Sequence, residues 1–210
     1  KQCFNILHDH RGLSVHFMLD LDGTIYQTLD LKERARHATI SNDRSVGIEI
    51  ANMGAYPPSE TKVLDEWYQR DESGRPYIKV PERLGDPMFQ TKGFVGRPAR
   101  TVPVHGNVQN TDLVQFDLTP EQYAALARLT AALCRIFPKL QCDYPRGPEG
   151  RLVTTRLPDA DLKAFGGVLA HYHIQTNKTD PGPAFDWDRV IAGARRLLGL
   201  SPLKPGASPP

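Results

Sequence analysis

The sequence predicts an α/β fold in which a mixed central β-sheet is flanked by helices. Three patterns support this prediction: a β-hairpin over residues 16–28, a strand over residues 46–52, and amphipathic helices over residues 118–137 and 185–200. The 210 residues are 40% hydrophobic and 24% charged, which is typical of a globular chain that forms one domain.

The hairpin is predicted by two short runs on either side of an Asp-Gly pair. Residues 16–20 and 24–28 are rich in apolar, aromatic or β-branched side chains, which favour strands. Glycine in the turn between them adopts positive φ without a Cβ penalty. Asp-Gly in this position is therefore a strong hairpin signal.

The same turn allows a second interpretation. Residues 20–24 (DLDGT) resemble the DxDGT signature of haloacid-dehalogenase-type phosphatases, in which the first Asp is a nucleophile. Such an enzyme needs further Asp ligands for Mg²⁺ after another buried strand. The one Gly-Asp pair of the sequence, at residues 85–86, follows charged residues and precedes a proline. The hairpin is therefore favoured, and a magnesium phosphatase is a distant alternative.

The next predicted element is a strand over residues 46–52 (VGIEIAN). Alternation places Ile48 and Ile50 on one face of this strand and Glu49 on the other. Residues 54–113 follow without clear periodicity and are rich in Pro, Gly and charged side chains. We therefore expect a long irregular insertion that decorates the core.

The clearest helix is predicted over residues 118–137. Thr119 is its N-cap and Pro120 its first residue, and apolar side chains recur at spacings of three and four along one core-facing stripe. Residues 166–174 (GGVLAHYHI) predict a short buried strand that ends in histidines. Residues 185–200 predict a final amphipathic helix.

Composition excludes several classes of protein. The formal charge of 26 − 24 = +2 is too small to indicate a nucleic-acid partner. No window approaches the ~18 consecutive apolar residues of a membrane span. The three cysteines have no CxxC spacing, so we expect neither a disulfide framework nor a cysteine-based zinc site. Residues 201–210 are rich in Pro and Gly and predict a tail or linker.

The candidate chemistry lies at the end of the predicted strand and in the Pro/Gly loop after it. His171, His173, Lys178 and Asp180 fall within ten residues of one another. Imidazole and carboxylate are ligands of Zn²⁺, and a catalytic zinc has three protein ligands and one open position. A lysine beside a metal can stabilise a developing oxyanion. Histidines at strand ends and turns of this composition are also common without a metal, so both interpretations stay open here.

The motifs together resemble a known family. HFMLDLDGTIYQ, RHATISNDRSVGIEIANMG and AHYHIQTNKTDPGPAFDWDRVI occur in this order, with a TPEQY helix between the second and third. They resemble the type 2 zinc-dependent N-acetylmuramoyl-L-alanine amidases, whose fold is shared by peptidoglycan recognition proteins and amidase-type phage lysozymes. The resemblance covers residues 1 to about 200, apart from the insertion. In this family the DGT stretch is a hairpin turn without a nucleophile.

The resemblance implies a zinc cofactor held by His171 and Asp180. Recognition proteins typically have Cys at the position of Asp180, so the aspartate points to the bacterial amidases. The first zinc histidine of the family lies on a strand that precedes Lys1, and we expect the third ligand there. The predicted domain therefore spans residues 1–200 and lacks the family's first strand.

The resemblance also assigns catalytic roles. It makes Glu49 the general base toward a zinc-bound water and Lys178 the group that stabilises the tetrahedral oxyanion. His37 and His173 are secondary candidates for substrate binding. From the residues alone, Glu49 opposite a buried face is equally consistent with a solvated carboxylate.

The implied reaction is hydrolysis of the amide between N-acetylmuramic acid and L-alanine in peptidoglycan or muropeptides. Such a substrate favours the cell envelope or secretion over the cytoplasm. The alternative from another class is a peptidoglycan-binding module without catalysis, and the magnesium phosphatase is third.

Overall fold

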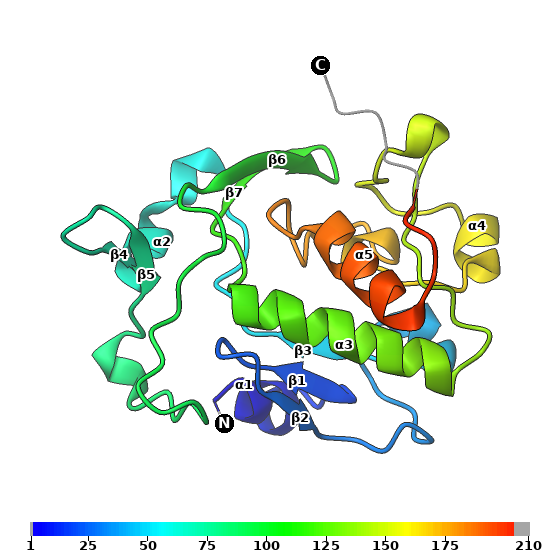
Figure 1. Ribbon diagram of the computed structural model, residues 1–210, viewed down its shortest axis with the longest axis horizontal. Helices are drawn as coiled ribbons and strands as arrows, with labels where there is room; N and C mark the ends of the chain where they lie inside the picture. Colours follow the sequence, from blue (N-terminus) through cyan, green and yellow to red (C-terminus); the bar gives the residue numbers. More distant parts are fainter. Residues whose placement is uncertain (1, 204–210) are drawn as a thin grey trace.

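The computed structural model describes residues 2–203. Within this range the chain is a mixed α/β protein with small β-sheets and several helices (Figure 1). The strands are β1 (Phe17–Leu19), β2 (Ile25–Gln27), β3 (Ile48–Ile50), β4 (Tyr68–Arg70), β5 (Pro76–Ile78), β6 (Val104–Val108) and β7 (Thr111–Gln115). The α-helices are α1 (Gln2–Asn5), α2 (Lys62–Trp67), α3 (Pro120–Ile136), α4 (Asp159–Ala164) and α5 (Trp187–Leu198). The short helical turns are the π turn η1 (Ile6–His10) and the 3₁₀ turns η2 (Thr39–Arg44), η3 (Pro58–Glu60), η4 (Glu82–Leu84), η5 (Pro148–Gly150) and η6 (His171–His173).

The central sheet has the strand order β2-β1-β3. β1 and β2 pair antiparallel, so the predicted hairpin is confirmed. Its turn has Gly23 at φ +82°, and Asp22 Oδ1 accepts the backbone N–H of Thr24 at 3.0 Å. The second oxygen of Asp22 accepts the N–H of Thr91 at 2.8 Å. The DGT stretch therefore acts as a turn that also fastens the insertion.

β3 confirms the predicted strand and pairs in parallel with β1. A buried histidine fixes where this pairing begins. The His16 side chain is 1% exposed, and its Nδ1 accepts the N–H of Gly47 at 3.0 Å while its Nε2 donates to the carbonyl of Glu33 at 3.0 Å. Because both ring nitrogens are bonded to backbone, His16 ties the start of β3 to the hairpin.

Helix α3 confirms the predicted helix and its N-cap. Thr119 Oγ1 accepts the N–H of Gln122 at 3.1 Å, and Gln122 Oε1 accepts the N–H of Thr119 at 3.0 Å. This reciprocal capping box satisfies two donors that a helix start leaves free. α5, which confirms the last predicted helix, lies beside α3 (Figure 1). A Cβ at Gly193 would be 2.9 Å from Ala127 Cβ, so glycine permits this close approach.

The predicted strand over residues 166–174 is wrong. Residues 166–170 make no strand pairing, and the histidines form the 3₁₀ turn η6. The ring of His173 is the cause, because its Nδ1 accepts the N–H of Ala170 at 2.9 Å and closes the turn. The apolar run is buried for a different reason: Ala170 and Tyr172 pack into the main core.

The insertion is more regular than the expected irregular segment, because α2 and the β4–β5 hairpin lie within it and the β6–β7 hairpin begins there. A small hydrophobic cluster holds the insertion against the main body. The cluster contains residues of the insertion and residues that directly follow it. Leu64 and Tyr68 pack with Val114 and Phe116, and the rings of Tyr68 and Phe116 stack at 4.0 Å. In Figure 1 the β6–β7 hairpin lies on the opposite side of α3 from the central sheet.

Candidate functional site

The structure brings His171 and Asp180 together. His171 lies in η6, and the loop after it folds back so that Asp180 Oδ2 is 3.0 Å from His171 Nδ1. The backbone supports this approach, because the N–H of Tyr172 donates to the carbonyl of Asp180 at 3.4 Å. Two residues nine positions apart therefore present an imidazole nitrogen and a carboxylate oxygen at one point.

The other ring nitrogen of His171 determines what this pair can bind. His171 Nε2 lies 2.7 Å from Gln175 Oε1, and the amide nitrogen of Gln175 donates to Asn177 Oδ1 at 3.4 Å. With the oxygen of Gln175 facing the ring, this hydrogen bond forms when Nε2 carries the proton. In a neutral ring Nδ1 then directs a lone pair at the carboxylate of Asp180. Two acceptors face each other, which favours a proton or a metal cation between them.

The ionised form of Asp180 is favoured when a proton on His171 Nδ1 lies between the two side chains. Neighbouring protein atoms desolvate the carboxylate and oppose its ionisation, but the hydrogen bond and charge of His171 and the charge of Lys178 outweigh this. The pKa of Asp180 is therefore lower than its usual value. The charge of the half-buried Lys178 is the smallest of the causes that lower the pKa of Asp180.

The geometry fits two ligands of a tetrahedral zinc. Bonds of about 2.0–2.1 Å at a tetrahedral angle place neighbouring ligand atoms ~3.3 Å apart. The observed separation of 3.0 Å between His171 Nδ1 and Asp180 Oδ2 is close to this value. Within residues 2–203, no group of three or more His, Cys, Asp or Glu side chains is arranged to hold a metal. The described residues thus offer two side chains of the chemical type that zinc binds.

His37 lies near this pair in a protected environment. Its ring packs against Gly47, where a Cβ would come within 2.8 Å of the ring, and its Nε2 is 3.2 Å from Ser45 Oγ. Burial, together with the charges of His16 and His171, lowers the pKa of His37 to about 4. The ring is therefore neutral near pH 7 and can donate or accept a hydrogen bond.

Glu49 and its strand behave as alternation predicts. Ile48 and Ile50 pack against the hydrophobic core, so Glu49 points from the opposite face of β3 and remains partly exposed.

The structure places His173 in the interior. Its side chain is 0% exposed, its Nδ1 accepts from Ala170, and its Nε2 donates to the carbonyl of Val153 at 2.6 Å. Burial lowers its pKa to about 4. Both ring nitrogens form hydrogen bonds with backbone groups, so the ring holds η6 against the segment of Val153.

Sequence reasoning missed three glutamines that surround the site. Gln175 orients the His171 ring, while Gln109 and Gln115 hold the backbone on either side of it. The glutamine side chain is a neutral amide that does not titrate, so catalytic and metal-binding motifs do not point to it. The one available signal was the position of Gln175 a single helical turn after His171.

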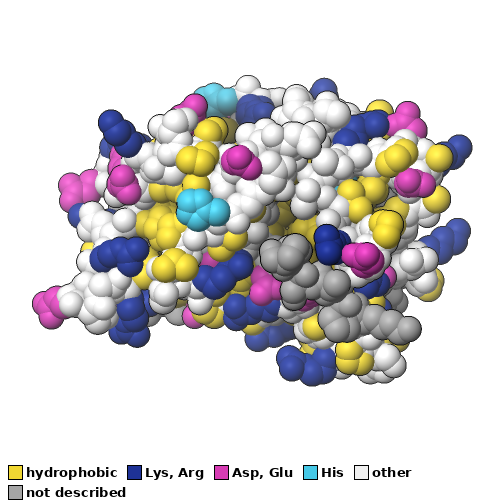
Figure 2. Space-filling model, turned by 90° about the horizontal axis from the view of Figure 1, so that it is seen from above, with side chains coloured by type: hydrophobic (Ala, Val, Ile, Leu, Met, Phe, Trp, Pro, Cys, Tyr) yellow, Lys and Arg dark blue, Asp and Glu magenta, His cyan; other side chains and the backbone are white. Residues whose placement is uncertain are grey.

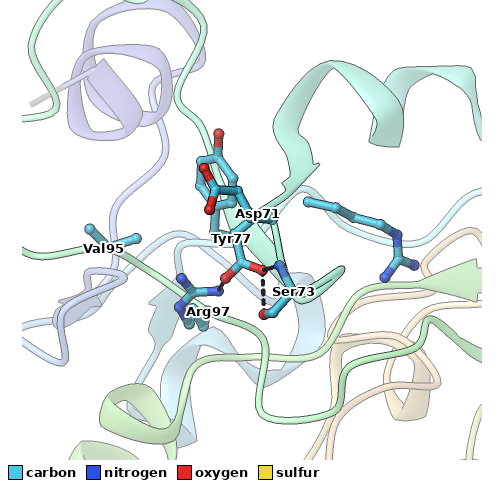
Figure 3. A pocket seen from close by; sticks show the side chains of 7 residues that line it. Asp71, Ser73, Tyr77, Val95 and Arg97 are labelled. Carbon is cyan, nitrogen blue, oxygen red and sulfur yellow. Dashed lines mark hydrogen bonds and ion pairs between the residues drawn. The ribbon is translucent and has the colours of Figure 1, made fainter.

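A hollow of about 610 Å³ lies at the β4–β5 hairpin (Figure 3). Polar groups that line it bond to one another. Asp71 accepts a hydrogen bond from Ser73 Oγ at 2.6 Å and pairs with Arg97 at 2.8 Å. Arg97 also lies over the ring of Tyr77. The hydrogen bond from Ser73 is the main reason that the pKa of Asp71 is lower than its usual value. These contacts describe a braced hairpin turn.

The surface agrees with the small net charge. On the face drawn in Figure 2, side chains of both signs are interspersed. Among the residues the structure describes, no helix is long and apolar enough to cross a membrane.

Comparison with known proteins identifies one similarity. Residues 2–70 match the family model described as N-acetylmuramoyl-L-alanine amidase. The matched segment contains His37 and Glu49 and ends before His171 and Asp180. No curated protein and no solved structure matches the chain. The match supports the amidase family and a role in cleaving or binding the amide linkages of peptidoglycan.

Proposed function

We propose that this protein is a zinc-dependent N-acetylmuramoyl-L-alanine amidase. Its substrate would be the amide between the lactyl group of N-acetylmuramic acid and the L-alanine of the stem peptide, in peptidoglycan or muropeptides. The proposal combines the family match over residues 2–70 with the site outside that segment.

The observation that carries the proposal is the pairing of His171 with Asp180. Their facing acceptor atoms lie 3.0 Å apart, and Gln175 accepts the proton of the opposite ring nitrogen. Histidines that ligate metals usually donate their second N–H in this manner, which fixes the tautomer and the ring plane. In our assignment His171 and Asp180 are two of the zinc ligands.

The remaining chemistry belongs to two side chains. When bound, a catalytic zinc supplies Lewis acidity and activates water near neutral pH. Glu49 accepts a proton from the attacking water and returns it to the departing amino group of L-alanine. Lys178 places a positive charge beside the carbonyl oxygen as that oxygen becomes negative. Lys178 takes no part in holding the metal, because its protonated ammonium has no lone pair.

His37 is assigned to substrate contact. Its neutral ring, held against Gly47, can exchange one hydrogen bond with a polar group of the glycopeptide. His173 is left out of the substrate site because its ring is fully buried.

The test is digestion of purified peptidoglycan in the presence of added zinc, followed by detection of new L-alanine amino termini. We expect a chelator to stop the release, zinc to restore it, and Mg²⁺ to have no effect. Binding to peptidoglycan without any release would instead indicate a recognition module. Activity on phosphate esters that depends on Mg²⁺ would support the phosphatase.

A further inference from the structure

The β6–β7 hairpin contacts both chain segments that carry the candidate zinc ligands. Its five-residue strands pair in continuous register from Val104↔Gln115 to Val108↔Thr111. Two glutamine side chains from this hairpin reach the backbone beside His171 and beside Asp180. Neither glutamine belongs to the motifs that suggested the function.

Gln109, in the turn of the hairpin, holds the segment of His171. Gln109 Nε2 donates to the carbonyl of Tyr172 at 2.9 Å and to the carbonyl of Gln175 at 2.9 Å. Gln109 Oε1 accepts the N–H of Arg156 at 3.3 Å. Both amide hydrogens are used, so the side chain links Tyr172 to Gln175 and stabilises the turn that carries His171.

Gln115, the last residue of β7, holds the segment after Asp180. Its side chain is buried, its Nε2 donates to the carbonyl of Pro181 at 2.8 Å, and its Oε1 accepts the N–H of Ala184 at 2.9 Å. The same Nε2 lies 3.2 Å from Asn52 Oδ1, two residues beyond the end of β3. One amide therefore joins the loop of Asp180 to the strand of Glu49.

We propose that Gln109 and Gln115 are positioning residues that set the separation of His171 and Asp180 from one rigid hairpin. The inference rests on the proposed function, because the separation matters for a metal site. Such sites tolerate ligand displacements of only about 0.5 Å. Both segments are otherwise loop or short turn, so the paired strands provide the stiffness that these segments lack.

The test uses the full chain and the isosteric variant Gln109→Glu. A carboxylate keeps the shape of Gln109 but cannot donate to the carbonyls of Tyr172 and Gln175. Asn107→Ala is the matched control, since Asn107 lies on the same hairpin and its exposed side chain donates a hydrogen bond to Asp112, away from the site. Circular dichroism and thermal unfolding first establish that both variants are folded.

Two measurements then decide. Amide hydrogen exchange at Ile174 and Gln175 should be at least about tenfold faster in Gln109→Glu and unchanged in the control. Zinc affinity, measured with Zn²⁺ alone by calorimetry, should fall about 10- to 100-fold in Gln109→Glu, as for other groups that orient metal ligands. Gln115→Glu should weaken zinc similarly, and the Gln109 variant suffices if Gln115→Glu does not fold.

The outcomes separate the two proposals. Unchanged exchange and unchanged zinc affinity in folded Gln109→Glu would overturn the positioning role. A wild-type protein that carries all three expected ligands and still binds no zinc would instead remove the amidase mechanism. In that case hydrogen exchange at Ile174 and Gln175 still tests whether the hairpin holds the His171 turn.

Discussion

Gly182 packs directly on the side-chain amide of Gln115. A Cβ at position 182 would lie 2.1 Å from Gln115 Oε1, and the backbone of Gly182 has φ +89°. Only glycine satisfies both conditions without strain. This contact sits two residues after Asp180, so the loop that carries the carboxylate is fitted to a buried glutamine.

Gly182→Ala should therefore destabilise the protein by about 2–4 kcal/mol, because the new methyl group displaces Gln115 or the loop. Gly74→Ala is the matched control: its φ is +76°, but no atom lies within 4 Å of the added Cβ. The control should cost only about 1 kcal/mol, from the backbone alone. Denaturant unfolding of both variants checks the difference, and equal losses would contradict the contact.

Acid should weaken the fold through His37. Burial and the neighbouring charges lower the pKa of its folded form to about 4, whereas an unfolded histidine has a pKa of about 6.5. The unfolded chain thus binds more protons between these values. The contribution of His37 to stability is complete above pH ~6.5 and is lost as the pH falls toward 4.

Between pH 7 and pH 5, His37 should reduce the free energy of unfolding by about 1–2 kcal/mol. Urea unfolding across this range measures the slope, and His37→Gln should make it shallower. An NMR titration that finds an ordinary pKa for His37 would contradict the packing of its ring on Gly47.

Metal binding and catalysis should separate by mutation. In the zinc-loaded protein, extended upstream to include the third ligand, Lys178→Ala should retain zinc while turnover drops by roughly two to three orders of magnitude. The reason is that the lysine acts on charge that develops in the transition state. Glu49→Gln should behave similarly through loss of the base. His171→Ala should lose zinc and activity together. Zinc content and release of stem peptide are measured in parallel, and near-normal turnover of Lys178→Ala would remove the lysine from the mechanism.

His173→Ala should act on stability rather than on substrate affinity. The change leaves a cavity and removes the partners of Ala170 N–H and the Val153 carbonyl. We expect a loss of about 2–4 kcal/mol in the free energy of unfolding. Binding of a soluble muropeptide, measured well below the unfolding temperature, should change little. A large loss of affinity in a stably folded variant would return His173 to the substrate site.

Local signals in the sequence predicted the elements that local interactions stabilise. Thr119, Pro120 and Gln122 lie within four residues of one another, and together they define the start of α3. The hairpin over residues 16–28 depends in the same way on its own turn. Such elements can be read from a short window because their stabilising contacts lie inside that window.

Elements that depend on distant partners could not be predicted in this way. The run over residues 166–174 has the composition of a buried strand, but the ring of His173 closes it into a 3₁₀ turn. The juxtaposition of His171 and Asp180 was expected from the loop between them. The hydrogen bonds that support these two residues could not be expected, because Gln109 and Gln115 contact segments more than sixty positions away in the sequence.

These distant contacts also bear on the order in which the chain folds. The bond between Gln115 and Ala184 spans 69 positions, and that between Gln109 and Tyr172 spans 63. Closing such long loops slows folding, because chain entropy is lost before any contact forms. During synthesis the β6–β7 hairpin is made before its partners Tyr172 and Ala184. The candidate site is therefore completed only after the segment from Tyr172 to Ala184 has been made and has packed against the hairpin.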